Sequence, residues 1–379
     1  MVTIAVPLEG DGETRTAISP ETVKKYAALG CSVKIQSGAG AHSNIIDDDY
    51  AEMGAEIVGS SIEAIKDADI ILKVRRPSND EIGVMKEGAI VAAMLDPYDD
   101  QDGLKALAEK GVISFAMELM PRISRAQSMD VLSSQSNLAG YKAVIDAAAN
   151  FAQAMPMMMT AAGTVPPAKV FVMGAGVAGL QAIATAKRLG AIVTATDVRP
   201  AAKEQVASLG GKFIAVENDE FKEAETSGGY AKEMSDDYKR EQAELVANHV
   251  KTQDIIITTA LIPGRPAPQL ITGEMVRSMK KGSIIYDMAV ERGGNCELSR
   301  LGEIVDEVGV YIMGPINIPG ALAGNATSLY AKNLFAFLSL MIDKDEGVKI
   351  DFEDEIIQGT LISNGGKIVH PMLTGEGDK

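Results

Sequence analysis

One glycine-rich stretch, "KVFVMGAGVAGLQAIATAKRLGAIVTATD", constrains the fold of this 379-residue chain more than any other. An apolar strand pattern runs directly into G-x-G-x-x-G, formed by Gly174, Gly176 and Gly179, and a helical pattern follows. The first glycine permits a tight turn, the second lets a pyrophosphate approach the backbone, and the third lets helix and strand pack closely. This order predicts a dinucleotide-binding β-α-β unit whose helix N-terminus binds phosphate.

An acidic residue follows at the position where such a unit recognises ribose. Asp197 ends the strand after the helix, at about the 20-residue offset from which a carboxylate binds the ribose 2′-hydroxyl. A carboxylate there repels a 2′-phosphate, so the sequence favours NAD(H) over NADP(H). Arg199 lies two residues later and leaves that preference open, because an arginine near the ribose accommodates the phosphate.

Strand and helix patterns alternate along two series. Residues 2–120 alternate short apolar runs with amphipathic patterns, which is typical of a parallel sheet covered by helices. Six β-rich runs, from "AKVFVMG" to "VYIMG", match the strand count of a doubly wound fold. Two long helical patterns, "SNLAGYKAVIDAAANFAQAM" and "LAGNATSLYAKNLFAFLSLMI", flank this second series. We therefore expect an α/β protein with two Rossmann-like domains and parallel sheets, joined by two long crossover helices with a cleft between them.

The expected domain boundaries follow from these patterns. Residues 1–130 form an N-terminal α/β domain, and the C-terminal tail, residues 343–379, returns to complete it. An "NGG" turn in this tail predicts a strand or hairpin. Residues 131–342 form the NAD(H)-binding domain and include both long helices.

Composition excludes several classes of protein. The formal net charge is -16 and lysine and arginine do not cluster, so nucleic acid is not an expected partner. Cys31 and Cys296 cannot build a disulfide framework, and no Cys/His cluster has zinc-like spacing, so we expect no metal and a reducing cytoplasm. The N-terminus lacks a signal-peptide pattern, and polar residues and prolines interrupt the apolar tract at residues 143–168, so we expect no membrane span.

The sequence offers no evident acid–base group beside the glycine turn. A conventional dehydrogenase exchanges a substrate proton, most often through histidine. His42, His249 and His370 all lie away from the strand end at that turn, and packing or surface roles explain them. Lys73 and Arg15 either bind an anion or a carbonyl, or are solvated charges. The question becomes whether a proton-bearing substrate exists at all.

Polar side chains crowd the stretch "MPRISRAQSMDVLSSQSNLAG", residues 120–140, without a clean period of 2 or 3.6. Its composition suits a linker between domains. Its position, at the entrance to the second domain, suits a loop that lines a ligand cleft. The residues alone leave both interpretations open.

Four stretches carry a resemblance to a known family. They are "MELMPRISRAQSMDVLSSQSNLAGYKAVIDAA", "PMMMTAAGTVPPAKVFVMGAGVAGLQAIATAKRLGA", "TSGGYAKEM" and "TTALIPGRPAPQLIT". Together they closely resemble domain I, the NAD(H)-binding component, of the proton-translocating nicotinamide nucleotide transhydrogenases. The resemblance covers almost the whole chain. The glycine-rich stretch also resembles a signature of alanine dehydrogenase, while "VPLEGDGETRTAISPETVKKYAALG" follows the other signature only loosely.

The resemblance implies a function that needs partners. In that family, domain I passes hydride between NAD(H) and the NADP(H) held by a separate domain III, and a membrane domain II couples the transfer to proton movement. The chain has no stretch like domain II, so it resembles the form with a split alpha subunit. The implied partners are a membrane-spanning proton-channel subunit and an NADP(H)-binding domain III. A homodimer, cytoplasmic and peripheral at the inner membrane through those partners, is also implied.

The resemblance gives the polar stretch a role. Arg122, Gln127, Asp130 and Ser133 match a family loop that lies over the nicotinamide. It implies that Asp130, Ser133 and Arg122 fix the carboxamide and ring, and that Gln127 contacts ribose near the partner nucleotide. The chemistry agrees, because these side chains complement the donors and acceptor of a carboxamide.

A second loop of the family carries a tyrosine after paired glycines, and Gly228, Gly229 and Tyr230 match it. The resemblance implies a mobile lid and counts Tyr230 with the four residues above as catalytic. The full set implied to contact NAD(H) is Arg122, Ile123, Ser124, Arg125, Gln127, Ser128, Met129, Asp130, Ser133, Gly174, Ala175, Gly176, Val177, Gly179, Asp197, Val198, Arg199, Gly229, Tyr230, Ala260 and Leu261.

Two other functions remain as alternatives. A soluble alanine dehydrogenase-like enzyme shares the fold, but its catalytic histidine aligns with Met94 and its catalytic aspartate with Glu291. Losing the base removes the proton transfer that amino-acid oxidation needs. An NAD-binding regulatory module would bind the nucleotide without any hydride transfer.

Overall fold

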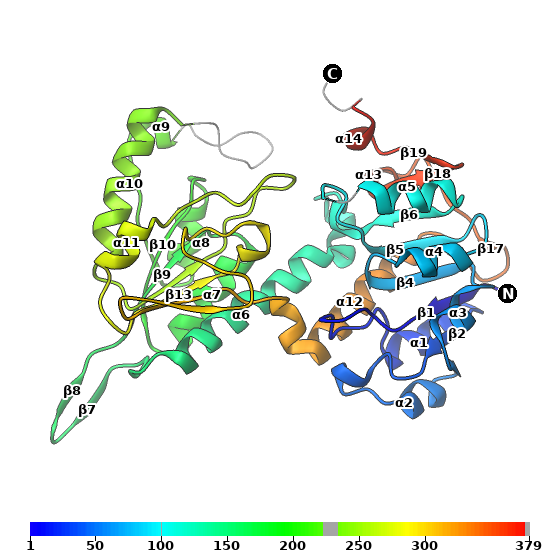
Figure 1. The fold of residues 1–379 in the computed structure, drawn as a ribbon, viewed down its shortest axis with the longest axis horizontal. Helices are drawn as coiled ribbons and strands as arrows, with labels where there is room; N and C mark the ends of the chain where they lie inside the picture. The colour runs from blue at the N-terminus through cyan, green and yellow to red at the C-terminus, as the bar shows by residue number, and fades with distance from the viewer. Residues whose placement is uncertain (100, 223–233, 376–379) are drawn as a thin grey trace. The chain divides into compact units, whose positions relative to one another are not determined.

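A computed structural model describes residues 1–99, 101–222 and 234–375 (Figure 1). The chain divides into two compact units, and each is described by itself. The first unit contains residues 1–135 and 319–379, and the second contains residues 136–318.

The first unit is built on a sheet with the strand order β19-β18-β6-β5-β4-β1-β2-β3. The strands are β1 (Thr3–Val6), β2 (Ser32–Gln36), β3 (Glu56–Val58), β4 (Ile70–Arg75), β5 (Ile90–Met94), β6 (Ile113–Ala116), β18 (Leu361–Asn364) and β19 (Lys367–Ile368). Strands β1 to β6 are parallel. The tail strand β18 pairs antiparallel with β6, Leu361 opposite Phe115, so the C-terminal tail extends this sheet.

Short helices connect and cover these strands (Figure 1). They are α1 (Pro20–Ala28), α2 (Asp47–Glu52), α3 (Ser61–Ile65), α4 (Asn79–Val84), α5 (Gln101–Glu109), α13 (Glu355–Thr360) and α14 (Pro371–Thr374), with the 3-10 segments η1 (Ala41–Ser43), η2 (Met117–Leu119) and η3 (Ser124–Met129). A separate two-stranded ribbon joins β16 (Ile342–Asp343) to β17 (Gly347–Val348).

The long helix α12 (Ala323–Leu338) belongs to the first unit, whereas the expected boundaries put it in the second. Its apolar face, including Tyr330, Leu334 and Phe337, joins the core formed by β1, β2, β4, β5 and β6. The ring of Phe337 packs edge-on against Phe115 with centroids 5.2 Å apart. The apolar face was readable from the sequence, but not which of two cores it would fill. The other long helix, α6 (Val131–Asn150), is divided at residue 135.

The second unit has the strand order β11-β10-β9-β12-β13-β15-β14. The strands are β9 (Lys169–Met173), β10 (Ile192–Thr196), β11 (Lys212–Phe213), β12 (Ile255–Thr258), β13 (Ile284–Asp287), β14 (Ile304–Glu307) and β15 (Val310–Met313). All pairings are parallel except that of β14 with β15. The six predicted runs form the parallel strands. The edge strand β14 was missed because its residues alternate between exposed and half-buried and make no apolar run.

Helices cover both faces of this sheet, as a parallel sheet requires. They are α7 (Val177–Arg188), α8 (Ala202–Ser208), α9 (Asp219–Lys222), α10 (Asp236–Val250) and α11 (Gly273–Ser278), with η4 (Val290–Arg292), while η5 (Ile318–Leu322) spans the boundary between the units. Successive residues of β9 enter different cores. Val170 and Val172 pack with residues of α6 and α7, and Phe171 and Met173 with residues of α10 and α11.

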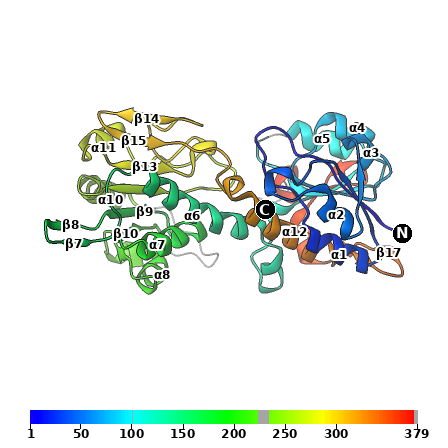
Figure 2. The same cartoon turned by 90° about the horizontal axis from the view of Figure 1, so that it is seen from below.

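One hairpin extends from the second unit beyond its sheet (Figure 2). It consists of β7 (Met158–Thr160) and β8 (Gly163–Val165), and all six strand residues are exposed. The expected α/β class with parallel-dominated sheets is confirmed. Among the helices in the described residues, none combines the length and the apolar character that a membrane crossing requires.

Candidate functional site

The topology of the second unit defines one place for a dinucleotide. The chain passes from β9 to β10 on one side, and β12 lies on the other side of β9. The strand order therefore reverses between β9 and β12. In open parallel sheets, ligands bind beyond the carboxyl ends of the strands at this switch point. Here those strand ends are followed by Gly174 and by Thr259.

The three motif glycines have the backbone properties that the turn requires. Gly174 has a φ of 103°, and its N–H donates to the Thr196 carbonyl at 2.9 Å. A Cβ at Gly179 would lie 1.8 Å from the Gly174 oxygen, so only glycine permits this contact between helix and strand end. A Cβ at Gly176 would meet nothing within 4 Å, so the space beside Gly176 is open. The open side of the turn is where a pyrophosphate would approach the backbone.

Helix α7 presents its N-terminus to the same space. Gly176 is its N-cap residue, and no side chain of the described residues caps this end. The N–H groups of a helix's first turn have no partner within the helix, and the helix dipole adds a partial positive charge. This end of α7 is therefore suited to bind an anionic group.

Asp197 lies against the glycine turn and is held there by two groups. Its Oδ2 accepts the Ala175 N–H at 2.7 Å. The Arg199 guanidinium donates to Oδ1 at 3.0 Å and to Oδ2 at 3.1 Å, and also to the Ala175 carbonyl at 3.2 Å. Arg199 thus compensates the charge of the predicted ribose-binding acid.

Exposed apolar side chains follow several strands at this edge of the sheet. Val177 is 41% exposed, Val198 62% and Leu261 53%. Each comes directly after, or one turn beyond, a buried strand. Apolar surface beside a few oriented polar groups is typical of small-molecule sites. These three residues lie where the sequence analysis expected nucleotide contacts.

Sequence reasoning missed Thr259, which joins the two strand ends. Its hydroxyl donates to the Gly174 carbonyl at 3.1 Å, and a Cβ at Gly174 would lie 2.4 Å from the same hydroxyl oxygen. The only sequence signal was the position of a threonine directly after the apolar run "DIIIT".

The polar segment, residues 120–135, lies in the first unit and includes η3 (Ser124–Met129). Ala126 and Met129 are buried in the first core, whereas Gln127 is exposed. The remaining exposed members of this segment are Arg122, Ser124, Arg125 and Ser128, and Ile123, Asp130 and Ser133 are half-buried. Two apolar contacts therefore hold a segment whose polar side chains face outward.

Asp130 and Ser133 cap helix α6. Asp130 Oδ1 accepts the Ser133 N–H at 2.8 Å, and Oδ2 accepts the Ser133 hydroxyl at 2.5 Å. Asn333 of α12 supports the preceding residues, since its Nδ2 donates to the Ser128 carbonyl at 2.8 Å and its Oδ1 accepts the Ser134 hydroxyl at 2.7 Å. The segment is thus tied to two helices by hydrogen bonds.

Arg125 fastens the segment to the tail. Its guanidinium donates to both carboxylate oxygens of Asp354, at 2.6 and 2.7 Å. Asp354 also caps α13, accepting the Ile356 N–H at 2.8 Å. The hydrogen bonds from Arg125 lower the pKa of Asp354, although partial burial opposes them. Gly228, Gly229 and Tyr230, the expected lid, lie outside the described residues.

Arg15 and Lys73 are buried in the first unit, so the interpretation as solvated charges is wrong. Arg15 forms a two-point pair with Glu13, at 2.7 Å for each contact, and donates to Gln135 at 2.9 Å. Lys73 Nζ lies 3.6 Å from Glu9 and 3.3 Å from Glu81. Both cations therefore already have carboxylate partners.

The pKa values of two of these carboxyl groups differ in direction. Burial would raise the pKa of Glu13, but the hydrogen bonds and charge of Arg15 outweigh it and lower the value to about 2. Burial raises the pKa of Glu9, because the more distant Lys73 compensates less of the desolvation cost. The Arg15 pair is thus the more strongly ionised of the two.

The three histidines have the packing and surface positions expected for them. His249 lies edge-on to Phe171, and its Nε2 is 2.9 Å from the Thr194 hydroxyl; burial lowers its pKa. His370 Nδ1 accepts the Met372 N–H at 3.3 Å as the cap of α14, and His42 is exposed in η1. None of the three lies at the switch point.

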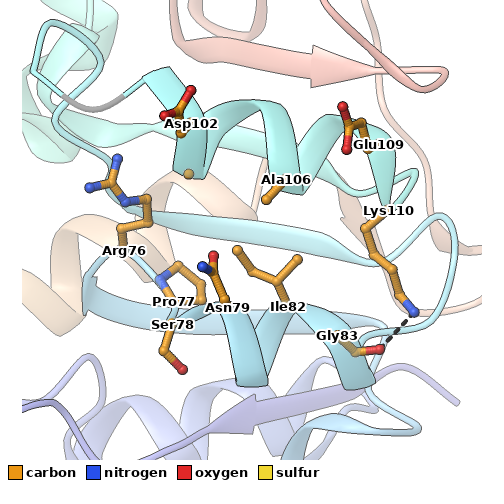
Figure 3. Close-up of a pocket in the computed structure, with 11 residues that line it drawn as sticks. Arg76, Pro77, Ser78, Asn79, Ile82, Gly83, Asp102, Ala106, Glu109 and Lys110 are labelled. Carbon is orange, nitrogen blue, oxygen red and sulfur yellow. Dashed lines mark hydrogen bonds between the residues drawn. The ribbon is translucent and has the colours of Figure 1, made fainter.

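A surface hollow of the first unit lies elsewhere, between α4 and α5 (Figure 3). It has a volume of about 670 Å³, and its rim includes Arg76, Asn79, Asp102 and Lys110. Lys110 donates to the Gly83 carbonyl at 2.8 Å. This hollow contains neither the glycine turn nor the polar segment. Within the portion of the chain that the structure describes, no group of three or more His, Cys, Asp or Glu side chains could hold a metal ion.

Two family matches cover both halves of the chain. Residues 5–139 match the family described as alanine dehydrogenase/PNT, N-terminal domain. Residues 143–371 match the family described as alanine dehydrogenase/PNT, C-terminal domain. The glycine turn lies within the second match, and most of the polar segment within the first.

Individual proteins give the same result with different degrees of similarity. The chain is 55% identical to the first portion of NAD(P) transhydrogenase subunit alpha from Rhodospirillum rubrum, over 99% of each chain. A solved structure of a transhydrogenase from Sinorhizobium meliloti is similar with a TM-score of 0.88 and 55% identity, covering 97% of this chain and 100% of that chain. An alanine dehydrogenase of Methanococcus maripaludis is 29% identical over 96% of this chain and 93% of its own.

Two glycine substitutions should separate the packing role of the turn from its ligand role. Gly179→Ala forces a Cβ against the Gly174 oxygen, and we expect it to lower the free energy of unfolding by about 1 to 3 kcal/mol. Gly176→Ala should change that free energy by less than about 0.5 kcal/mol, because the space is open. It should still raise the NADH dissociation constant about tenfold or more, since the methyl group enters the ligand's space.

Urea unfolding and NADH titration of both variants would check this, with Gly83→Ala in the exposed helix α4 as a control. Unchanged NADH affinity in Gly176→Ala would contradict the assignment of the open space to the nucleotide.

Proposed function

This chain belongs to the alanine dehydrogenase/PNT family, and we propose that it is the NAD(H)-binding first portion of the alpha subunit of a proton-translocating transhydrogenase. In this proposal it exchanges hydride between bound NAD(H) and NADP(H) on a partner domain, and a membrane partner couples the transfer to proton movement. The similarity over 99% of each chain to a transhydrogenase alpha subunit carries the proposal, because it includes both the glycine turn and the polar segment.

The arrangement of the residues fits a reaction that needs no proton transfer. None of the three histidines lies at the switch point, and Met94 and Glu291 occupy the positions aligned with the acid–base pair of alanine dehydrogenase. Direct hydride exchange between two nicotinamides needs alignment and an approach of about 3 to 3.5 Å. Positioning is therefore the main task of this subunit.

The glycine turn and its neighbours are proposed to hold the dinucleotide. Bound NAD(H) supplies the hydride donor or acceptor. Backbone groups of residues 174–179 and the N-terminus of α7 bind the pyrophosphate, and Asp197 accepts a hydrogen bond from the ribose hydroxyls while Arg199 keeps it in place. Val177, Val198, Ala260 and Leu261 form apolar walls that exclude water.

The polar segment is proposed to orient the nicotinamide, an assignment that rests on the match to the family loop. Asp130, Ser133 and Arg122 would bind the carboxamide, and Gln127 would contact ribose. The hydrogen bonds between Asp130 and Ser133 leave further lone pairs on the carboxylate for an amide donor. Ile123, Ser124, Arg125, Ser128 and Met129 would complete the lining, with Gly229 and Tyr230 as members of a lid.

The proposed partners are a membrane-spanning proton-channel subunit and an NADP(H)-binding domain III, which would keep this chain on the cytoplasmic side of the inner membrane. We also propose a homodimer. The hairpin β7–β8 supports it, because Met159 is 76% exposed, Met157 58% and Met158 44%. A lone two-stranded hairpin is marginal in water, and exposed apolar patches mark association surfaces.

The alternative of an alanine dehydrogenase-like enzyme rests on the same fold and on the 29% identity to such an enzyme. It would reduce pyruvate with ammonia and NADH in the absence of any partner. A regulatory NAD-binding module would bind NADH and gain no hydride-transfer activity with any domain III.

The decisive assay mixes this chain with a domain III and follows the reduction by NADH of NADP⁺ or of a nicotinamide analogue bound there. We expect a rate well above that of domain III alone, because the two nicotinamides can then react directly. The same preparation should show no NADH oxidation with pyruvate and ammonia. A rate no higher than that of domain III alone would overturn the proposal.

Asp130→Asn should slow hydride transfer about 10- to 100-fold, because a small misplacement of the ring has an effect of that size. NADH affinity should change much less, since asparagine is as good a helix cap as aspartate. Stopped-flow rates and NADH titration would be compared with Asp80→Asn, the same change on the exposed face of α4. Comparable losses of rate and affinity would mean that the segment mainly anchors the nucleotide.

Met159→Asp should weaken the proposed homodimer, because a charge placed in an apolar contact must be desolvated. Light scattering coupled to gel filtration should then show a shift from twice the chain mass toward the chain mass. Met372→Asp, a change at a methionine 49% exposed on α14, serves as the control. A wild-type chain that elutes as a monomer at all concentrations would remove the dimer from the account.

A further inference from the structure

Asn295 is a fully buried polar residue whose side chain holds one backbone position. Its Oδ1 accepts the Ala260 N–H at 3.0 Å, and its Nδ2 donates to the Ala260 carbonyl at 2.8 Å. The same Nδ2 donates to the Pro268 carbonyl at 2.8 Å. Both N–H bonds and the acceptor of the carboxamide are therefore used. Asn295 pairs with Ala260 as a neighbouring strand would.

Asp287, also fully buried, holds Asn295 in turn. It is the last residue of β13, directly opposite Thr258, the last residue of β12. Its carboxylate accepts five hydrogen bonds, at 2.6 to 3.0 Å, from the backbone N–H groups of Ala289, Asn295 and Cys296 and the hydroxyl groups of Thr258 and Ser299.

The turn between Asp287 and Asn295 wraps closely around the carboxylate. Gly294 has a φ of +83°, and a Cβ there would lie 2.9 Å from Asp287 Oδ2. Only a glycine lets the backbone approach this closely in that conformation. The network is therefore a built feature of the carboxyl edge of the sheet.

Ala260 is the point at which this network reaches the switch point. It follows Thr259, whose hydroxyl donates to the Gly174 carbonyl at 3.1 Å. A Cβ at Gly174 would lie 3.4 Å from the Ala260 nitrogen, so the backbone at Ala260 packs directly against the glycine turn. Ala260 and Leu261 thus border the space beyond β9 from the β12 side.

We propose that Asn295, anchored by Asp287, is a positioning residue that fixes the backbone of Ala260 and with it the β12 side of the dinucleotide site. This inference rests on the proposed binding of NAD(H) by the second unit. A loop at the end of a strand would otherwise sample several conformations, and ordering it would reduce binding affinity. Asn295 does this ordering before the ligand arrives.

The two halves of the site should depend on Asn295 differently. In a doubly wound sheet each half binds one mononucleotide, and the dinucleotide crosses the crevice between them. Asp197 and the glycine turn belong to the β9–β10 half, whereas Ala260 belongs to the β12–β13 half. A mononucleotide that uses only the first half, 5′-AMP, should therefore bind without help from Asn295, whereas NADH requires it.

The test uses the full chain with Asn295→Ala, and titrates both NADH and 5′-AMP. We expect the NADH dissociation constant to rise about tenfold, as for the loss of a buried hydrogen-bonding group, while that of 5′-AMP stays within about twofold. Asp197→Ala should weaken both ligands. Ser283→Ala removes a buried hydroxyl at the opposite edge of the same sheet, and should leave both affinities unchanged.

Equal losses for NADH and 5′-AMP, or an unchanged NADH affinity, would overturn the inference. If Asn295→Ala does not fold, Ser299→Ala decides by the same criterion, because it removes only one of the five donors to Asp287. A wild-type chain that fails to bind NADH would overturn the proposed function itself, which distinguishes the two failures.

Discussion

The close approach of α7 to the end of β9 is the contact on which the second unit depends. Gly179 lies so near the Gly174 carbonyl that no side chain fits between them. This contact directs the helix N-terminus at the switch point and leaves the space beside Gly176 open. Thr259 and Asp197 then pack against the same turn from the neighbouring strands. Phosphate binding, ribose recognition and the strand order at this edge are therefore consequences of one steric constraint.

The polar segment shows how residues with a proposed function also serve the fold. Asp130 and Ser133 cap α6, Arg125 binds Asp354, and Asn333 supports Ser128 from α12. These contacts hold side chains such as Gln127 in exposed positions. A segment that must present polar groups to a ligand needs such support, because an unsupported loop would have to be ordered on binding. The linker and ligand interpretations of this stretch are thus compatible.

Much of the architecture could be predicted because it rests on local patterns. Alternating apolar runs and helical stretches predicted the parallel strands, and the order of strand, glycines, helix and acid predicted the turn at Gly174. The missed features lack such a pattern. Strand β14 has no apolar run, and α12 has an apolar face that does not specify its core. The partners of Arg15 and Lys73 are carboxylates, and no periodicity reveals which charges will be buried together.

The sequence by itself determined the α/β class, the glycine turn and the family, because these depend on residues that are neighbours along the chain. Only the tertiary structure decided which distant residues meet. It placed Asn295 against Ala260, 35 positions earlier, and Asn333 against Ser128, 205 positions earlier. Such contacts form where strands end at a common edge or helices cover a common core, and hydrogen-bond geometry then selects the partners. A one-dimensional pattern contains the donors and acceptors, but not the distances between them.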